Sequence, residues 1–172
     1  MKEVINVNTG EVAVRRGKFT LQAIAIGSCI VVVAYDSKAK IAGMVHIMLP
    51  EHAPEQSLEK TKYAFDGVEQ MLNQMLEFGS HTNGIEVCLI GAGNVLQKED
   101  DTICADNIKS VTTILGEKLI LVRASALGGY KRKSVFLDVE TGSISYTEGN
   151  DQQKPLWQPQ DTVAIKISLK DE

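Results

Sequence analysis

The sequence predicts an α+β fold, in which mixed or antiparallel layers of β-sheet pack with two main helices. Two observations indicate this class. The first fifty residues contain several runs rich in β-branched residues, and two later segments repeat apolar residues at the spacing of an α-helix. With 172 residues the chain has the size of a single domain and can bury a substantial core.

The N-terminal third is expected to be β-rich. Glycines and an aspartate separate runs of strand-forming residues, so we predict strands at 11–16, from Leu21 onward, at 30–34 and at 41–48. The stretch Asp36-Ser37-Lys38-Ala39 is a plausible turn between the last two strands.

Two helices are expected further along the chain. The first runs from about Ser57, a candidate N-cap, to Phe78, with Gly79 as its stop signal. Its apolar stripe is Ala64, Phe65, Val68, Met71, Leu72, Met75 and Leu76. The second covers 105–115, where Ile108, Val111 and Leu115 recur at helical spacing.

The C-terminal half adds strands and a tail. Strands are predicted at 85–89, which ends in Gly91-Ala92-Gly93-Asn94, at 119–122, and in a hairpin of 134–139 with 143–147 that turns at Glu140-Thr141-Gly142. Residues 150–161 are polar and contain Pro155 and Pro159, and 162–170 alternate as an added edge strand. We therefore expect a domain over 1–149, followed by a polar linker and a C-terminal strand over 150–172.

The composition excludes several kinds of partner. The net charge is −4, the isoelectric point is about 5.4, and the basic residues form no long block, so neither nucleic acid nor an anionic membrane is expected. No apolar run approaches the roughly 20 residues of a membrane span, so we expect no membrane insertion. Three cysteines without C-x-x-C spacing and the lack of a signal peptide indicate a reducing compartment, the cytoplasm.

Cys29 and His46 are the candidate catalytic pair. A thiol is nucleophilic as the thiolate, and a nearby imidazolium raises the thiolate fraction. If Tyr35 lies opposite Lys40 in a hairpin of the strands at 30–34 and 41–48, Cys29 lies directly opposite His46. A shift of one residue would put the two side chains on opposite faces of the sheet. The alternative is that Cys29, which precedes an apolar run, is a small core residue.

The remaining cysteines, histidines and glycines point to no cofactor. Cys88 lies in an apolar strand and Cys104 near a helix start, so both are interpreted as structural, although a helix N-terminus could make Cys104 reactive. The scattered histidines indicate no metal site. Leu96 stands where a nucleotide-binding G-x-G-x-x-G motif has its third glycine, so the Gly91–Gly93 turn is expected to shape the rim of a site instead.

Several short motifs follow one another at compatible spacing. They are Gly27-Ser28-Cys29, His46 with Leu49-Pro50, Lys62-Tyr63-Ala64 with Asp66, the loop 91–94, Asn107, and Gly128-Gly129 with Arg132 or Lys133. In this order they resemble the CheD family, the chemoreceptor glutamine deamidases of prokaryotic chemotaxis, over roughly residues 3–147. The resemblance implies a three-layer α/β sandwich and hydrolysis of receptor glutamine amides to glutamate by Cys29 and His46.

The resemblance also implies partners and further site residues. The partners would be the cytoplasmic domain of a chemoreceptor (a methyl-accepting chemotaxis protein) and a CheC-type phosphatase. For the reaction itself, backbone N–H groups near Ser28 and Cys29 are candidates for binding the oxyanion, and Gly27 would allow close approach of the substrate. The candidate contacts to substrate or partner are Gly91, Gly93, Asn94 and Arg132.

One departure from the family pattern concerns the third catalytic residue. The family has a threonine six residues before the nucleophile, and this chain has Ala23 there. Thr20 or Gln22 could take the role, although strand alternation points Gln22 away from the side of Ala23. Two alternatives to a deamidase follow: a catalytically weak or inactive adaptor that binds a CheC-type phosphatase or a chemoreceptor, and a cysteine hydrolase that acts on another amide.

Overall fold

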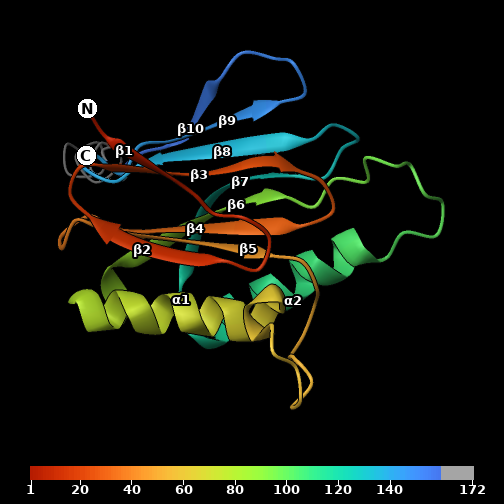
Figure 1. The fold of residues 1–172 in the computed structure, drawn as a ribbon, viewed down its shortest axis with the longest axis horizontal. Helices are drawn as coiled ribbons and strands as arrows, with labels where there is room; N and C mark the ends of the chain where they lie inside the picture. The colour runs from red at the N-terminus through yellow and green to blue at the C-terminus, as the bar shows by residue number, and fades with distance from the viewer. Residues whose placement is uncertain (160–172) are drawn as a thin grey trace, which may run out of the picture.

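Residues 1–159, which the computed structural model describes, form three layers (Figure 1). An outer sheet contains, in spatial order, β1 (Glu3–Asn6), β3 (Phe19–Ile26), β8 (Lys133–Asp138), β9 (Ile144–Glu148) and β10 (Lys154–Trp157). A central sheet contains, in spatial order, β2 (Val12–Arg16), β5 (Ile41–Ile47), β4 (Ile30–Asp36), β6 (Ile85–Gly91) and β7 (Leu121–Leu127). Two helices, α1 (Ala64–Phe78) and α2 (Ile103–Glu117), cover the other face of the central sheet. The predicted α+β class with two main helices is confirmed.

The strand β4 lies in the middle of the molecule and is buried along its whole length. Ile30, Val32 and Ala34 pack toward the helices, in one hydrophobic core. Val31 and Tyr35 pack toward the outer sheet, in the other core. A strand covered on both faces needs apolar residues at every position, which explains the unbroken apolar run in the sequence.

The hairpin of β4 and β5 forms, but its predicted register is wrong by two residues. Tyr35 lies opposite Ala42 rather than Lys40, and Val31 lies opposite His46. The turn is longer than expected, because the Asp36 carboxylate accepts hydrogen bonds from the N–H groups of Lys38 and Ala39, at 3.1 and 3.0 Å. A shift of two residues preserves the alternation of faces.

The helix α1 ends as predicted but begins later. Gly79 adopts the left-handed conformation, with φ of 119°, and its N–H bonds the carbonyl of Leu76. The start predicted at Ser57 is wrong, because the chain before α1 is paired instead: Leu49 and Tyr63 form a parallel bridge, and Ala64 N–H bonds the Leu49 carbonyl at 2.9 Å. Within residues 1–159, neither helix has the length and apolar content to cross a membrane.

The outer sheet contains two strands that the sequence did not predict. The strand β1 pairs in parallel with β3, so that Asn6 lies beside Gln22. The strand β10 falls inside the stretch expected to be a polar linker and pairs with β9. The hairpin of β8 and β9 forms as predicted. The strand expected at 162–170 lies outside the described residues.

Candidate active site

The segment from Gly27 to Cys29 lies where β4 begins and where β5 and β6 end. Ile30 pairs with Ile47 on one side and with Gly91 on the other. The carbonyl of Cys29 accepts a hydrogen bond from Ala92 N–H at 2.7 Å. Gly91 has φ of 116°, and a Cβ there would lie 2.4 Å from the Cys29 carbonyl oxygen. This position therefore requires glycine. The loop after β6 packs closely against the backbone of the candidate nucleophile and hydrogen-bonds it.

Asn107 holds the same segment from the side of the helices. Its side chain is fully buried, and Nδ2 donates hydrogen bonds to the carbonyls of Ser28 and Met48, both at 3.2 Å. Ser28 precedes Cys29, and Met48 follows the strand that carries His46. One side chain thus connects the two segments of the candidate catalytic pair.

The thiol of Cys29 is half-buried and faces the layer between the two sheets. It packs against the core that contains Val31 and Val33. Burial raises the pKa of the thiol, while hydrogen bonds from the Thr9 side chain and from the backbone N–H of Cys29 lower it. The net direction is upward, so the neutral thiol is the resting form at neutral pH.

The ring of His46 lies on the same side of the central sheet. It is 5% exposed and stands opposite Val31, which faces the outer sheet. Its Nδ1 lies 3.0 Å from the carbonyl oxygen of Val7. A carbonyl can only accept a hydrogen bond, so in the neutral ring the proton sits on Nδ1 and the lone pair on Nε2.

The electrostatics of His46 also favour the neutral ring. Burial lowers the pKa of His46 and outweighs the hydrogen bond to Val7 and the nearby carboxylate of Glu11, which both raise it. Together with the raised pKa of Cys29, this gives a neutral thiol and a neutral imidazole on the same side of the sheet, with His46 opposite Val31 and not, as predicted, opposite Cys29. The expected pairing with an imidazolium is therefore not the resting state of this pair.

Position 23 lies in the core against which Cys29 packs, but its alanine has no polar group, and Thr20 and Gln22 alternate to the opposite face of β3. Ala23 is 1% exposed and pairs with Val135 in the outer sheet. The Gln22 amide donates a hydrogen bond to Asn6 Oδ1 at 2.8 Å, and Thr20 lies between Val4 and Asp138 in the sheet. The residue that the sequence did not single out is Val7, whose carbonyl accepts the hydrogen bond from the His46 ring.

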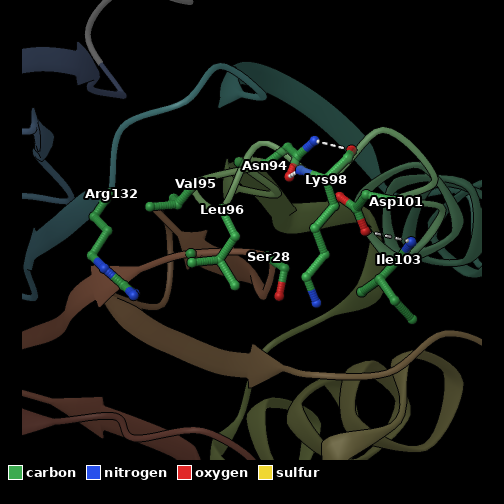
Figure 2. Close-up of a pocket in the computed structure, with 10 residues that line it drawn as sticks. Ser28, Asn94, Val95, Leu96, Lys98, Asp101, Ile103 and Arg132 are labelled. Carbon is green, nitrogen blue, oxygen red and sulfur yellow. Dashed lines mark hydrogen bonds between the residues drawn. The ribbon is translucent and has the colours of Figure 1, made fainter.

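A cavity of about 210 Å³ lies beside the segment that leads to Cys29, the candidate nucleophile. Leu96 and Lys98 reach from the loop after β6 toward the space that Ser28 borders, and Arg132 stands on the opposite flank (Figure 2). Its lining residues are Gly27, Ser28, Gly93, Asn94, Val95, Leu96, Lys98, Asp101, Ile103 and Arg132.

Hydrogen bonds fix the walls of this cavity. The Asn94 side chain exchanges hydrogen bonds with the backbone of Lys98, at 2.8 and 3.0 Å, and Asn94 N–H bonds the Gly129 carbonyl at 2.9 Å. Arg132 Nη1 donates a hydrogen bond to the Ala25 carbonyl at 3.2 Å. Gly93, Asn94 and Arg132 thus line the cavity with Gly27 and Ser28, whereas Gly91 braces the backbone behind it. Among residues 1–159, no group of three or more His, Cys, Asp or Glu side chains is arranged to hold a metal.

Comparison with known proteins gives one consistent result. A family model described as "CheD chemotactic sensory transduction" matches residues 48–148. A protein of Chlorobium luteolum named "Probable chemoreceptor glutamine deamidase CheD" is 33% identical over 150 residues, which cover 87% of this chain and 75% of that protein. Proteins named "Chemoreceptor glutamine deamidase CheD" are 28% identical in Thermotoga maritima, over 84% of this chain and 90% of that one, and 26% identical in Halalkalibacterium halodurans, over 91% and 100%.

Proposed function

This chain belongs to the CheD family, and we propose that it hydrolyses glutamine side-chain amides of chemoreceptors to glutamate, with Cys29 as nucleophile and His46 as its base. The observation that carries the assignment of residues is the placement of the two side chains. Both lie on the side of the central sheet that faces the outer sheet, and Gly27 and Ser28, which precede Cys29, line the cavity. The His46 ring is held in the tautomer that can accept a proton at Nε2.

The first chemical step starts from neutral groups. His46 Nε2 removes the proton from Cys29 as Sγ attacks the carboxamide carbon, so that the thiolate forms only when it is used. The carbonyl oxygen of the substrate becomes an oxyanion. Backbone N–H groups near Ser28 and Cys29 are the candidates to donate hydrogen bonds to it.

The second half of the reaction releases ammonia and then glutamate. The imidazolium of His46 gives its proton to the departing amide nitrogen, the C–N bond breaks, and ammonia leaves a thioester on Cys29. His46, neutral again, takes a proton from water, whose oxygen attacks the thioester carbon. The C–S bond breaks, the sulfur recovers a proton, and the product carboxylate is released. No cofactor takes part in these steps.

The cavity suits one polar side chain on a protein surface. Val95 and Leu96 offer apolar contact for the methylenes of a glutamine, and Arg132 and Lys98 offer positive charge near its mouth. Positive charge there also suits carboxylates next to the target glutamine. The partner that fits is the cytoplasmic domain of a chemoreceptor, and the protein would act in the cytoplasm. A CheC-type phosphatase is a second expected partner.

A catalytically weak adaptor is the alternative, and Ala23 favours it, because the family's third catalytic residue has no counterpart there. The presence of both Cys29 and His46, on the same side of the central sheet, supports the enzyme. An Ala23→Thr variant distinguishes the enzyme from the adaptor. A large gain in the rate of deamidation would indicate an enzyme whose activity Ala23 limits. If wild type is inactive and the variant gains no activity, the adaptor is supported.

The test is deamidation of a glutamine-bearing cytoplasmic receptor fragment, followed by mass spectrometry of its peptides. Wild-type protein and Cys104→Ala are expected to convert glutamine to glutamate, and Cys29→Ala is expected to convert none. Cys104 is the matched control because it is a second thiol near the site, buried and with its pKa raised to about 11. A fragment that binds without conversion would support the adaptor, and conversion by Cys29→Ala would contradict the assigned nucleophile.

A further inference from the structure

A second hollow, of about 430 Å³, lies beside the cavity that Gly27 and Ser28 line. Val95 and Arg132 line both spaces, and Figure 2 shows these two side chains at the same flank of the cavity. The second hollow, as it is called below, is also lined by Tyr130, which is exposed. A protein chain bound at the cavity would therefore contact the second hollow as well.

The charge of the second hollow is positive. Its lining residues include Lys131 and Arg132 and no carboxylate. Lys131 lies 3.9 Å from Asp151, and both side chains are more than half exposed, so this ion pair contributes little. Lys133 is buried and lies 3.7 Å from Glu148. Within residues 1–159, no carboxylate pairs with Arg132. The guanidinium is therefore a charge that the described part of the chain leaves unpaired.

The position of the Arg132 guanidinium is fixed close to the candidate nucleophile. Its Nη1 donates a hydrogen bond to the Ala25 carbonyl at 3.2 Å. A Cβ on Gly27 would lie only 3.1 Å from Nη1, so the glycine lets the guanidinium pack against the backbone two residues before Cys29. A guanidinium carries several N–H donors, and within residues 1–159 the Ala25 carbonyl is its only acceptor. Donors remain for a bound group.

We propose that the second hollow is a subsite for the protein substrate, in which Arg132 binds the carboxylate of an acidic residue close to the target glutamine. A guanidinium matches a carboxylate through two parallel N–H···O bonds, which an amide or a hydroxyl cannot accept equally well. The target glutamine enters the neighbouring cavity. Among the glutamines of a receptor, those with an acidic neighbour are then selected. This inference rests on the proposed function, but binding at the subsite can be measured without deamidation.

The experiment compares two forms of the receptor fragment. The acidic form keeps the Asp and Glu residues within about four residues of the converted glutamine, the range over which side chains share one face of a helix, and the neutral form has alanine there. Wild type is expected to have a KM roughly fivefold lower for the acidic form, with the same kcat, as one exposed ion pair provides. Arg132→Gln is expected to have the higher KM for both forms. A wild type without preference, or an Arg132→Gln protein that keeps it, would overturn the proposal.

Two control variants separate this role from general charge and from support of the backbone. Lys38→Gln removes the same charge at the other end of β4 from Cys29, and it is expected to keep the preference for the acidic form. Ser134→Ala removes the hydrogen bond that Ala25 N–H donates to Ser134 Oγ at 2.9 Å. Any effect of Ser134→Ala is expected to be equal for the two forms. Loss of the preference in either control would contradict a specific contact with Arg132.

Charge reversal gives a second measurement. The acidic residue whose replacement raises the KM is changed to lysine, and the fragment is offered to wild type and to Arg132→Glu. Wild type is expected to act on it more slowly than on the neutral form, whereas Arg132→Glu is expected to prefer it, because the two charges are exchanged. A preference of Arg132→Glu for the original acidic form would contradict the proposal.

Binding separates the subsite from the reaction. The Cys29→Ala protein, with and without Arg132→Gln, is titrated with the fragment and with variants that lack the acidic residues around each glutamine in turn. Weaker binding on loss of either partner, with no further loss when both are absent, supports the subsite even if wild type deamidates nothing, in which case the proposed function alone fails. If deamidation is seen but neither KM nor binding depends on these carboxylates, the subsite fails and the proposed function stands.

Discussion

The Nδ1–H of His46 donates a hydrogen bond to the backbone carbonyl of Val7, with 3.0 Å between nitrogen and oxygen. Val7 is itself buried and held to β3 by its N–H. A main-chain acceptor in a fixed position selects one tautomer of the ring and one orientation. In the proposed reaction, Nε2 is therefore the position that exchanges a proton.

Replacement of His46 by asparagine tests this role. The asparagine amide can still donate to the Val7 carbonyl, but it provides no base. We expect kcat for deamidation to fall roughly 10²- to 10⁴-fold, with binding of the receptor fragment retained. Single-turnover kinetics and a binding assay measure the two properties. An activity within a fewfold of wild type would rule out His46 as the base.

The pH dependence of kcat/KM follows from the direction of the two shifts. Burial lowers the pKa of His46 from its ordinary 6.5, so the neutral base persists below that pH. The acid limb of the profile is therefore expected to have its midpoint below pH 6.5. Deamidation measured between pH 5 and 8 checks this. A midpoint above 6.5 would indicate an imidazolium stabilised by a thiolate, contrary to the neutral pair.

The same shift predicts how stability depends on pH. In the unfolded chain His46 binds a proton as the pH falls through 6.5, whereas in the folded chain its lowered pKa delays protonation. The unfolded state then binds more protons, so the free energy of unfolding decreases as the pH falls below 6.5. Urea unfolding at pH 7.5 and 5.5 measures this. His46→Asn is expected to show a smaller decrease than wild type, and an equal decrease would contradict the prediction.

Gly91 and Gly17 provide a matched pair of substitutions. Both have positive φ, 116° and 100°, but a Cβ at Gly91 meets the Cys29 carbonyl, whereas a Cβ at Gly17 meets nothing within 4 Å. Gly17→Ala is expected to cost about 1 kcal/mol of stability through backbone strain, with full activity. Gly91→Ala is expected to lose more stability and at least tenfold in kcat, because the nucleophile segment must move. Thermal unfolding and deamidation assays measure both.

Asn107 and Ser110 provide a second pair, on one buried face of α2. Asn107→Leu removes the donor for the carbonyls of Ser28 and Met48, and it is expected to cost about 1–3 kcal/mol and to lower kcat. Ser110→Ala removes the hydrogen bond that Glu51 N–H donates to Ser110 Oγ, away from the candidate nucleophile. This variant is expected to be less stable but to keep the wild-type kcat. Equal activity of the two variants would show that Asn107 only stabilises the fold.

Local signals predicted the parts of this fold that local chemistry determines. Gly79 ends α1 by taking the left-handed conformation, and Gly142, with φ of 78°, turns the hairpin of β8 and β9 as expected. The start of α1 could not be read in this way, because pairing of Leu49 with Tyr63 depends on a contact across 14 residues. The strand β1 pairs in parallel with β3, and no local sequence pattern predicts this pairing.

The candidate site, too, was predictable only where local sequence patterns determine it. The register of β4 and β5 was wrong by two residues, yet Cys29 and His46 still face one layer, because an even shift preserves the alternation of side chains. The motif residues therefore served as a guide to one location. Val7 reaches that location through the pairing of β1 with β3, and it carries no sequence signal for catalysis.

The strand β1 has four residues and, within residues 1–159, pairs only with β3, at the margin of the outer sheet. Local opening of this strand would withdraw the Val7 carbonyl from the His46 ring while the helices and the central sheet stay folded. Catalytic competence would then be lost at a smaller free-energy cost than global unfolding. In hydrogen exchange, the amides of residues 3–11 would report on the competent fraction of the protein, independently of the slowly exchanging core.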